Sequence, residues 1–417
     1  MRYLMIVPVP FRPVDGGAAV ESAFATHLRE LLASLAPRVT SIEVLAPTLP
    51  PEPQAAAASA LAILRPDVDR IAFTAAYPVR RGRLATLLGL PGLIARVWRA
   101  VGRAGWVHAG PSPLFLPFEN VGLLIGWLRR RVTVYVTDID HRGSARMNLA
   151  TGTWSRAVVR RRRLLHEPWT ALQHHLARLL CSTVFLKGQA MVRDYGRGRP
   201  HVHYILDCAH TADLLLPPAR LAAKAADQRQ RRRRRACYFG RLVPYKGVDR
   251  MLRAVRAARD AGADVTFDVF GAGDEQARLA ALAAELQLGD VVAFHGARPY
   301  GPAFFAELAD LDLLLAAPLS EDTPRSAIDA QALGMGVLAF DTYYYAELAQ
   351  QGAGVATAPW PDDAALGRQL AALAADRERL VDLGARGVAF AAANTQESWL
   401  RRRASWTPGI TATAGSP

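Results

Sequence analysis

The sequence has little cysteine, little lysine and no long hydrophobic run, and each shortage excludes a class of protein. Its cysteines, Cys181, Cys208 and Cys237, are too scattered for a disulfide framework or a paired Cys/His zinc site. The most apolar later stretch, residues 121–128, is far shorter than the roughly 20 residues that cross a bilayer. The N-terminal run MRYLMIVPVPF soon meets prolines, so it fits a buried first strand better than a secretion signal. We therefore expect a cytoplasmic protein without a transmembrane helix.

Apolar residues and arginine, in contrast, are abundant. The chain has 417 residues, of which 51% are hydrophobic and 8% aromatic, enough for two packed domains. The net charge of +14 comes almost entirely from arginine, because the only lysines are Lys187, Lys224 and Lys246. GC-rich codon usage explains such an arginine content without any function. Attraction to phosphorylated donors, lipid phosphates or an anionic membrane surface explains it equally well.

Strand and helix patterns alternate along the chain, which predicts the α/β class with parallel sheets. An early strand at 4–8 is followed by a turn with Gly16 and Gly17, and then by a helix with apolar positions from Val20 to Leu32. The other predicted strands are 41–45, 106–109, 131–137, 182–186, 236–239, 265–270, 291–294, 311–316 and 336–340, and the other helices are 248–258 and 397–406.

A proline pair followed by a polar and basic run separates the two halves, and it predicts a linker. The predicted organisation is a Rossmann-like domain at 1–210, the basic linker at 211–235 and a second Rossmann-like domain at 236–392. A helix at 393–408 and a flexible tail at 409–417 complete the chain. Two such domains enclose a cleft, and ligands of parallel sheets bind at the carboxyl ends of the strands.

Residues 240–247, with the sequence GRLVPYKG, follow a predicted strand and set two cations on one turn. The Arg241 guanidinium can bridge two phosphate oxygens, and the Lys246 ammonium adds a point charge. The helix that starts beside them directs backbone N–H groups outward. This arrangement suits a diphosphate, whereas a merely solvated basic turn is the alternative for the motif taken alone.

Two further turns follow the next predicted strands. Gly271 and Gly273 lie after the strand at 265–270, where the lack of side chains lets the backbone approach a ligand closely. A simple tight turn is the alternative. His295 follows the strand at 291–294, where it could bring backbone beside a nucleobase, although a single histidine is more often structural.

The most specific pattern is the pair of carboxylates in residues 320–330, SEDTPRSAIDA. Glu321 lies where a strand ends, and Asp329 lies on the following helix. Carboxylates are strong acceptors for sugar hydroxyls. The intervening segment Thr323-Pro324-Arg325 predicts a loop whose backbone amides start that helix and suit an anion or a sugar oxygen.

In this order, the motifs resemble the retaining GT-B glycosyltransferases of family 4, the glycosyl transferases group 1. The family pattern G-R-L-x-x-x-K-G is present at 240–247, V-x-G-x-G-x-E at 269–275 and E-x7-E at 321–329. The similarity covers residues 240 to about 354 and implies a GT-B fold, two Rossmann-like domains facing each other across a cleft. It also implies a metal-independent enzyme without a cofactor, which moves a sugar from a nucleotide-diphosphate donor to an acceptor hydroxyl.

The resemblance assigns roles by position. It implies that Arg241 and Lys246 bind the donor phosphates and stabilise the leaving group, and that Glu321 contacts the transferred sugar. Asp329 replaces the usual Glu and would contact the ribose with a shorter reach. The helix at 397–406 would cross back onto the first domain. It also implies that Gly16 and Gly17 approach the diphosphate from the opposite wall. With the residues singled out above, the predicted donor-binding set is completed by Gly271, Gly273, His295, Thr323, Pro324 and Arg325.

The N-terminal half departs from the family pattern, which often ends a central strand in histidine. Here the strand ends in Asp138-Ile139-Asp140-His141, so Asp138 and His141 are competing candidates for contact with the acceptor or the sugar. Asp-x-Asp also resembles the metal site of the GT-A architecture. A structural role, an acceptor contact and metal ligation all stay open for this segment, and we expect no metal.

Basic and apolar residues interleave at 80–83, 127–131 and 160–169, a pattern typical of segments that rest on an anionic membrane. Solvated helix faces are the alternative. The acceptor is unknown; a lipid-linked saccharide at the inner face of the membrane, another glycan and a secondary metabolite are the candidates. A GT-B-like sugar epimerase or phosphorylase is the rival enzyme. A nucleic-acid-binding protein is the non-enzymatic rival, and we expect no nucleic acid because no recognition motif is present.

Overall fold

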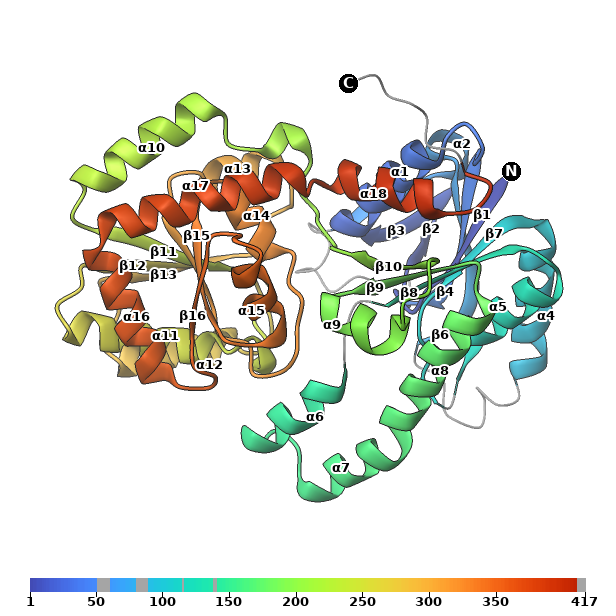
Figure 1. The fold of residues 1–417 in the computed structure, drawn as a ribbon, viewed down its shortest axis with the longest axis horizontal. Coiled ribbons are helices and arrows are strands. Elements are labelled where there is room, and N and C mark those ends of the chain that lie inside the picture. Colours follow the sequence, from blue (N-terminus) through green and yellow to red (C-terminus); the bar gives the residue numbers. More distant parts are fainter. Residues whose placement is uncertain (51–60, 80–88, 115, 138–140, 411–417) are drawn as a thin grey trace. The chain divides into compact units, whose positions relative to one another are not determined.

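The chain forms two compact α/β units, each built around a parallel sheet (Figure 1). The computed structural model describes residues 1–50, 61–79, 89–114, 116–137 and 141–410. Unit 1 consists of Met1–Asp138, Arg160–Asp207 and Glu397–Pro417, and unit 2 of Ile139–Val159 and Cys208–Gln396. The predicted class, α/β with two Rossmann-like domains, is confirmed.

Unit 1 contains a parallel sheet with the strand order β10-β9-β8-β7-β1-β4-β6. Alternate residues of the central strand β1 point to opposite faces, so that Leu4 and Ile6 enter one core cluster while Tyr3 and Met5 enter another. Both faces are therefore covered, as parallel sheets require. The strands are β1 (Arg2–Ile6), β4 (Ser41–Thr48), β6 (Ile71–Pro78), β7 (Ala104–Ala109), β8 (Val132–Thr137), β9 (Thr183–Lys187) and β10 (Val202–Ile205).

Helices cover the two faces of this sheet in separate layers. One layer buries apolar residues of α4, α5 and α8 against the sheet, and the other buries residues of α1 and α18. The helices of unit 1 are α1 (Ser22–Leu35), α2 (Pro66–Asp69), α4 (Leu90–Arg103), α5 (Phe118–Leu128), α8 (Glu167–Leu180), α9 (Gln189–Met191) and α18 (Gln396–Trp406), with π-helical turns η2 (Arg162–His166) and η3 (Val192–Gly196). Helix α7 (Arg156–Arg161) spans the change from unit 2 to unit 1.

Glu119 lies fully buried in the first turn of α5, and this burial raises the pKa of its carboxyl to about 7. The folded protein therefore holds the proton between pH 4.5 and 7 while the unfolded chain releases it. Stability consequently falls as the pH rises through this window.

We expect Glu119→Gln to unfold at higher urea concentration than the wild type at pH 8, by up to about 3 kcal/mol in unfolding free energy. The two proteins should converge as the pH falls below 4.5, because the Glu119 carboxyl is then neutral in both the folded and the unfolded state. Urea titrations at the two pH values measure this, with the exposed Glu285→Gln as control. An equal effect of Glu119→Gln at both pH values would contradict the burial of a charged carboxylate.

Unit 2 contains a second parallel sheet with the order β13-β12-β11-β14-β15-β16. Its strands are β11 (Arg234–Phe239), β12 (Val265–Phe270), β13 (Val292–Gly296), β14 (Leu313–Ala316), β15 (Gly336–Phe340) and β16 (Val355–Ala358). Its helices are α6 (His141–Ala150), α10 (Pro218–Gln230), α11 (Val248–Asp260), α12 (Gln276–Glu285), α13 (Pro302–Leu308), α14 (Ser326–Ala332), α15 (Tyr343–Gln350), α16 (Asp363–Ala375) and α17 (Arg377–Ala393), with 3-10 turns η4 (Ala212–Leu214) and η5 (Pro244–Lys246).

The segment predicted as a linker, residues 211–235, is folded instead. Pro218 lies in the first turn of α10, where its missing N–H costs nothing, and the helix packs on α17. Arg234 already belongs to β11, and its buried guanidinium donates to the carbonyl of Gln228 at 2.6 Å. Good helix formers between the prolines and the arginines outweigh the break that the prolines suggested.

The early part of the chain also differs from the prediction. Val20 belongs to strand β3 (Gly17–Glu21), and the helix begins only at Ser22. β3 pairs with β2 (Arg12–Val14) and β5 (Leu61–Leu64) in a small antiparallel sheet that the sequence did not indicate.

None of the helices in the described ranges has the length and the apolar character of a membrane-spanning segment.

Candidate functional site

The carboxyl ends of β13, β12, β11 and β14 form one edge of the sheet in unit 2. The chain runs from β11 outward through β12 to β13 and then returns to β14 on the other side of β11. The β11–β14 edge is therefore a topological switch point, where doubly wound sheets bind ligands. Backbone bonds hold the loops together, since Gly240 N donates to Phe270 O at 3.0 Å and Gly271 N to Gly296 O at 2.8 Å.

Two glycines allow these loops to pack backbone against backbone. A Cβ on Gly247 would lie 1.9 Å from the carbonyl oxygen of Ala317, and a Cβ on Gly271 equally close to that of Gly240. Both residues have left-handed φ angles, +66° and +146°. Glycine is therefore required at both positions by space as well as by conformation.

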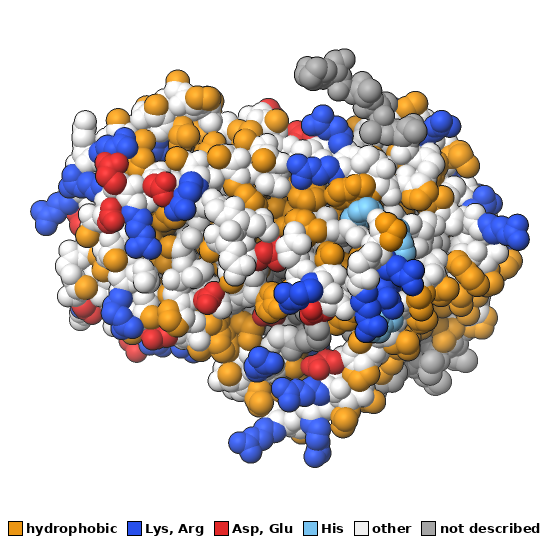
Figure 2. Space-filling view, viewed as in Figure 1, with side chains coloured by type: hydrophobic (Ala, Val, Ile, Leu, Met, Phe, Trp, Pro, Cys, Tyr) orange, Lys and Arg blue, Asp and Glu red, His pale blue; other side chains and the backbone are white. Residues whose placement is uncertain are grey.

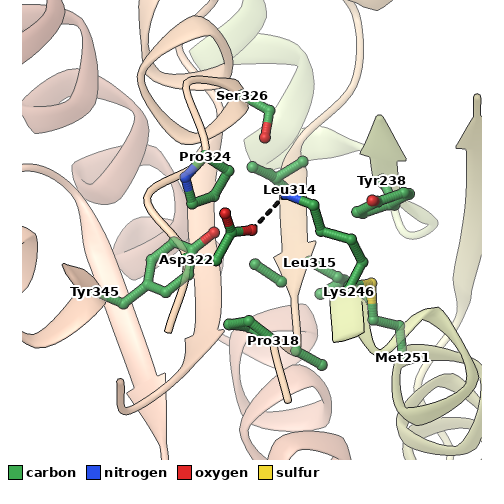
Figure 3. Close-up of a pocket in the computed structure, with 12 residues that line it drawn as sticks. Tyr238, Lys246, Met251, Leu314, Leu315, Pro318, Asp322, Pro324, Ser326 and Tyr345 are labelled. Atoms are coloured by element: carbon green, nitrogen blue, oxygen red, sulfur yellow. Dashed lines mark hydrogen bonds and ion pairs between the residues drawn. The ribbon is translucent and has the colours of Figure 1, made fainter. Parts of the chain in front are cut away.

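Lys246, predicted to bind the donor, lies at the end of η5 and forms an ion pair with Asp322 (Figure 3). The two side chains are each 14% exposed and come from the loops after β11 and β14. They lie in a pocket whose other lining side chains include Tyr238, Met251, Leu314, Pro318, Pro324, Ser326 and Tyr345. The structure thus brings together a cation and an anion in a largely apolar setting at the switch point.

Asp322 is a site residue that the sequence analysis missed. It follows Glu321 directly, and the family pattern directed attention to the first carboxylate only. The signal was the pair of adjacent acids at a strand end. Its second oxygen accepts a bond from Thr323 N at 3.1 Å, which fixes the orientation of the carboxylate.

The two tyrosines of the pocket are hydrogen-bond donors at any physiological pH. Burial, and secondarily the Asp322 carboxylate, raises the pKa of Tyr238 and Tyr345 far above the usual range. The Tyr238 hydroxyl donates to Arg241 O at 2.9 Å and so holds the loop after β11. Arg241 itself is exposed, and its guanidinium donates to the Tyr245 hydroxyl at 2.7 Å.

Glu321 lies against helix α6, which comes from a distant part of the sequence but belongs to unit 2. A Cβ on Gly143 would lie 2.6 Å from Glu321 Oε1, so the carboxylate is seated against the backbone of this helix. Next to it, Asn148 Nδ2 donates to Ser320 Oγ at 3.0 Å. Helix α6 therefore sets the position of the loop that carries both acids.

Asp329 is buried on α14, one turn beyond that loop. Its Oδ1 accepts a bond from the Tyr300 hydroxyl at 3.2 Å and lies 3.8 Å from His210 Nδ1. Thr323, Pro324 and Arg325 lie half-buried between Asp322 and the helix, as predicted for the loop. Contact between Asp329 and a ribose stays a prediction.

His295 is held in place by two neighbours. Its Nε2 lies 2.7 Å from Asp268 Oδ1, and its ring stacks on Phe270 with a centroid distance of 4.5 Å. Gly273 lies in the neighbouring loop, exposed to solvent. These contacts orient the imidazole at the edge of the site, and its contact with a nucleobase stays a prediction.

The roles of four other predicted residues stay predictions. Gly16 lies in the turn between β2 and β3 of unit 1, and Gly17 begins β3. Asp138 lies outside the described residues, as do the rest of the Asp-Ile-Asp segment and any metal site there. His141 begins α6, and its side chain is not among those described. Elsewhere in the described chain, no group of three His, Cys, Asp or Glu side chains could hold a metal ion.

Most of unit 2 is similar to a known protein family. Residues 222–389 match the family of glycosyl transferases group 1. A 2-deoxystreptamine glucosyltransferase of Streptomyces kanamyceticus is 35% identical over 103 residues, which span 25% of this chain and 26% of that enzyme. The chain thus aligns with about a quarter of its curated relative.

Solved structures share the fold over nearly the whole chain. HepE of Anabaena, in complex with UDP, has a TM-score of 0.64 at 16% identity and covers 97% of this chain and 98% of its own. Sucrose-phosphate synthase of Thermosynechococcus elongatus has a TM-score of 0.65 at 16% identity and covers 96% and 97%. At such identity the likeness concerns the fold, and it agrees with two Rossmann-like units.

Proposed function

We propose that this chain, which carries a group 1 glycosyl transferase domain on a GT-B fold, moves a sugar from a nucleotide diphosphate to an acceptor hydroxyl with retention of configuration. The observation that carries the proposal is the Lys246–Asp322 pair in the switch-point pocket, with Arg241 on the same loop. Cations at a strand end beside a helix start are suited to a diphosphate.

The Lys246 ammonium is the group that stabilises the negative charge of the departing phosphate. It has three N–H donors, and Asp322 accepts from one of them, so further donors are available to a ligand. Asp322 keeps the ammonium in position before the donor arrives. Charge that develops on the leaving diphosphate is then met by a cation that needs no reorientation, which is the most effective form of electrostatic catalysis.

Retention follows, in this proposal, from a front-face route. The bond between sugar and phosphate breaks first, and a phosphate oxygen of the departing diphosphate takes the proton of the acceptor hydroxyl. The acceptor oxygen then bonds to the anomeric carbon from the same side. The protein contributes Arg241 and Lys246 at the phosphates and Glu321 at the sugar hydroxyls.

The relatives narrow the substrates that we propose. HepE was solved with UDP, and the curated relative is named as a glucosyltransferase, so a UDP-linked hexose is the first donor to test. That relative acts on 2-deoxystreptamine, which favours a small polyhydroxylated acceptor. A lipid-linked saccharide is the second candidate acceptor.

The direct test is a panel of UDP-, GDP- and ADP-sugars, assayed by calorimetric binding and by mass spectrometry of products. We expect micromolar binding of one donor class and a sugar-bearing product when an acceptor is present. Consumption of donor without an acceptor-linked product would instead favour an epimerase. Absence of binding by every nucleotide sugar would overturn the proposal.

Gly143→Ala sharpens this test, because its new methyl group would push the Glu321 carboxylate away without removing it. We expect binding of the free nucleotide to stay within about twofold, while kcat falls roughly tenfold or more through the lost sugar contact. Gly92→Ala, where the new Cβ meets nothing closer than 3.7 Å, is the matched helical control. Full activity in Gly143→Ala would remove Glu321 from the proposed site.

A further inference from the structure

The net positive charge of the chain comes from one stretch. Residues 70–193 contain 20 Arg and Lys but four Asp and Glu, whereas the rest of the chain contains 31 basic and 33 acidic residues. The whole excess therefore lies in this stretch, most of which folds into unit 1. Arginine itself occurs throughout the chain, so what distinguishes this stretch is that its basic residues have few carboxylates to neutralise them.

Three helices from this stretch lie in one layer on one face of the unit 1 sheet. α4 packs on α5, and α5 packs on α8 (Figure 1). Their inner sides enter a common core with residues such as Val97, Leu123 and Ala177. Their outer sides therefore face away from the sheet together and form a continuous outer surface, which we name the α4–α5–α8 face.

This outer surface is unusually apolar. Among the described residues, 17 large hydrophobic side chains are exposed, and ten of them belong to these three helices and the adjoining η2 turn. Hydrophobic side chains gather along this part of the molecule in Figure 2. The ten are Ile94, Trp98, Leu124, Trp127, Leu128, Leu164, Leu165, Leu172, Leu176 and Leu179.

The leucines of α8 form a stripe rather than a scatter. Leu172, Leu176 and Leu179 are spaced by four and three residues, so they project from the same side of the helix. On the inner side, Gln173, His174 and Ala177 are buried. The apolar side of a helix is ordinarily the covered one, whereas the leucine side of α8 is exposed.

Arginine borders the leucines and tryptophans on this surface. Arg160, Arg161 and Arg163 are exposed immediately before the α8 stripe, and the Arg129 guanidinium lies 4.1 Å from the centre of the Trp98 ring. The carboxylates on these helices do not oppose them at the surface. Glu119 is fully buried, and Glu167 is half-buried.

We propose that the α4–α5–α8 face docks onto an anionic lipid bilayer, with its leucines and tryptophans among the headgroups and its arginines on the lipid phosphates. Exposed leucine and tryptophan beside arginine is the side-chain combination that rests at a membrane interface. A fluid bilayer needs no matching shape, and its negative surface complements a face without exposed carboxylates. The inference stands independently of the proposed sugar transfer.

The test is co-sedimentation of the full chain with vesicles of phosphatidylglycerol and phosphatidylcholine, compared with phosphatidylcholine alone. We expect strong binding to the anionic vesicles, weak binding to the neutral ones and release by salt. Leu172→Ser/Leu176→Ser/Leu179→Ser should weaken binding at least tenfold. Arg160→Glu/Arg161→Glu/Arg163→Glu should weaken it roughly a hundredfold.

Matched controls use exposed residues away from this face. Ile63→Ser/Val68→Ser removes exposed apolar groups of unit 1, and Arg38→Glu/Arg232→Glu/Arg401→Glu makes the same change of charge. Both should bind vesicles as the wild type does, and unchanged melting shows that all variants fold.

Four results would overturn the proposal. Equal binding to neutral and anionic vesicles would remove the role of the arginines, and wild-type binding by the leucine variant would remove the apolar stripe. A wild-type dimer that the leucine variant converts to monomer would assign the face to a second copy of the chain. Tighter binding to duplex DNA than to vesicles would assign it to nucleic acid.

Discussion

Lys246→Ala is expected to lose sugar transfer by roughly 10²–10³ in turnover, or about 2.7–4 kcal/mol of transition-state stabilisation, as when one preorganised donor is removed. The reason is that Lys246 is the ammonium inside the pocket, held at 14% exposure by Asp322. Arg241→Ala should lower turnover less than Lys246→Ala does. The Arg241 guanidinium is exposed and is held by Tyr245 alone among the contacts described for it, so it is less preorganised. Initial rates with a saturating donor, and calorimetric binding of the nucleotide, measure both variants.

Two controls separate this result from unfolding. Arg232→Ala removes an exposed cation of the same unit and should leave turnover within about twofold, as is usual for surface substitutions. Asp322→Ala leaves the ammonium without its described ion-pair partner, and Lys246→Ala leaves the carboxylate without its own, so we expect the two variants to lower stability to a similar extent. If Lys246→Ala keeps more than a third of the turnover while both controls behave as expected, the phosphate role of Lys246 is wrong.

The second large effect is expected from Gly247→Ala, which we expect to destabilise unit 2 by about 3 kcal/mol or more and to abolish nucleotide binding. An alanine there would need a left-handed backbone at φ +66°, which costs roughly 1–2 kcal/mol. It would also place Cβ 1.9 Å from the Ala317 carbonyl oxygen, so the loops after β11 and β14 would have to separate. That separation would pull Lys246 away from Asp322.

Gly262→Ala separates the cost of the left-handed backbone from the cost of the steric clash with Ala317. Gly262 also has a left-handed φ, +86°, but a Cβ there meets no atom within 4 Å. We therefore expect it to lose only the conformational part, and to bind nucleotide normally. Thermal melts and nucleotide titrations of the two variants give the comparison. Equal melting temperatures would show that the two loops are not in tight contact at Gly247.

The sequence predicted best those strands and helices whose apolar residues follow a regular pattern. The strands at 265–270 and 336–340 begin and end as predicted, because the first alternates apolar and polar residues up to Gly271 and the second is a continuous apolar run up to Asp341. Helix α11 was equally clear from its apolar spacing. In these segments, burial against a single sheet decides the structure, and the pattern of apolar residues in the sequence is enough to predict it.

The less predictable part depended on contacts between distant segments. Residues 139–159 belong to unit 2 although the chain around them builds unit 1, and no local pattern records that Gly143 must seat Glu321. Likewise, Asp322 and Lys246 are 76 residues apart, and their pairing follows from the adjacency of β11 and β14. The order of strands in a sheet is set by packing of whole elements, which a local pattern does not encode.

The resemblance to GT-B glycosyltransferases supplied what local pattern could not, and family and fold comparison confirmed it. It pointed to Lys246, which lines the switch-point pocket, and the role of this lysine at the donor phosphates stays a prediction. It could not reveal Asp322, because a family pattern marks which positions recur and says nothing of the partner that neutralises a cation before the substrate arrives.

The interleaving of the two units has a consequence for how the protein is made. Unit 1 takes residues from both sides of unit 2 in the sequence, since Leu400, Ala404 and Ile410 fill the same core cluster as Tyr3 and Met5. The Trp406 carbonyl oxygen also accepts a bond from Thr183 Oγ1 at 2.8 Å. During synthesis, β1 therefore leaves the ribosome long before α18, and the apolar side chains that α18 covers stay exposed while unit 2 is made. The core of unit 1 is completed only after the segments of unit 2 have been synthesised.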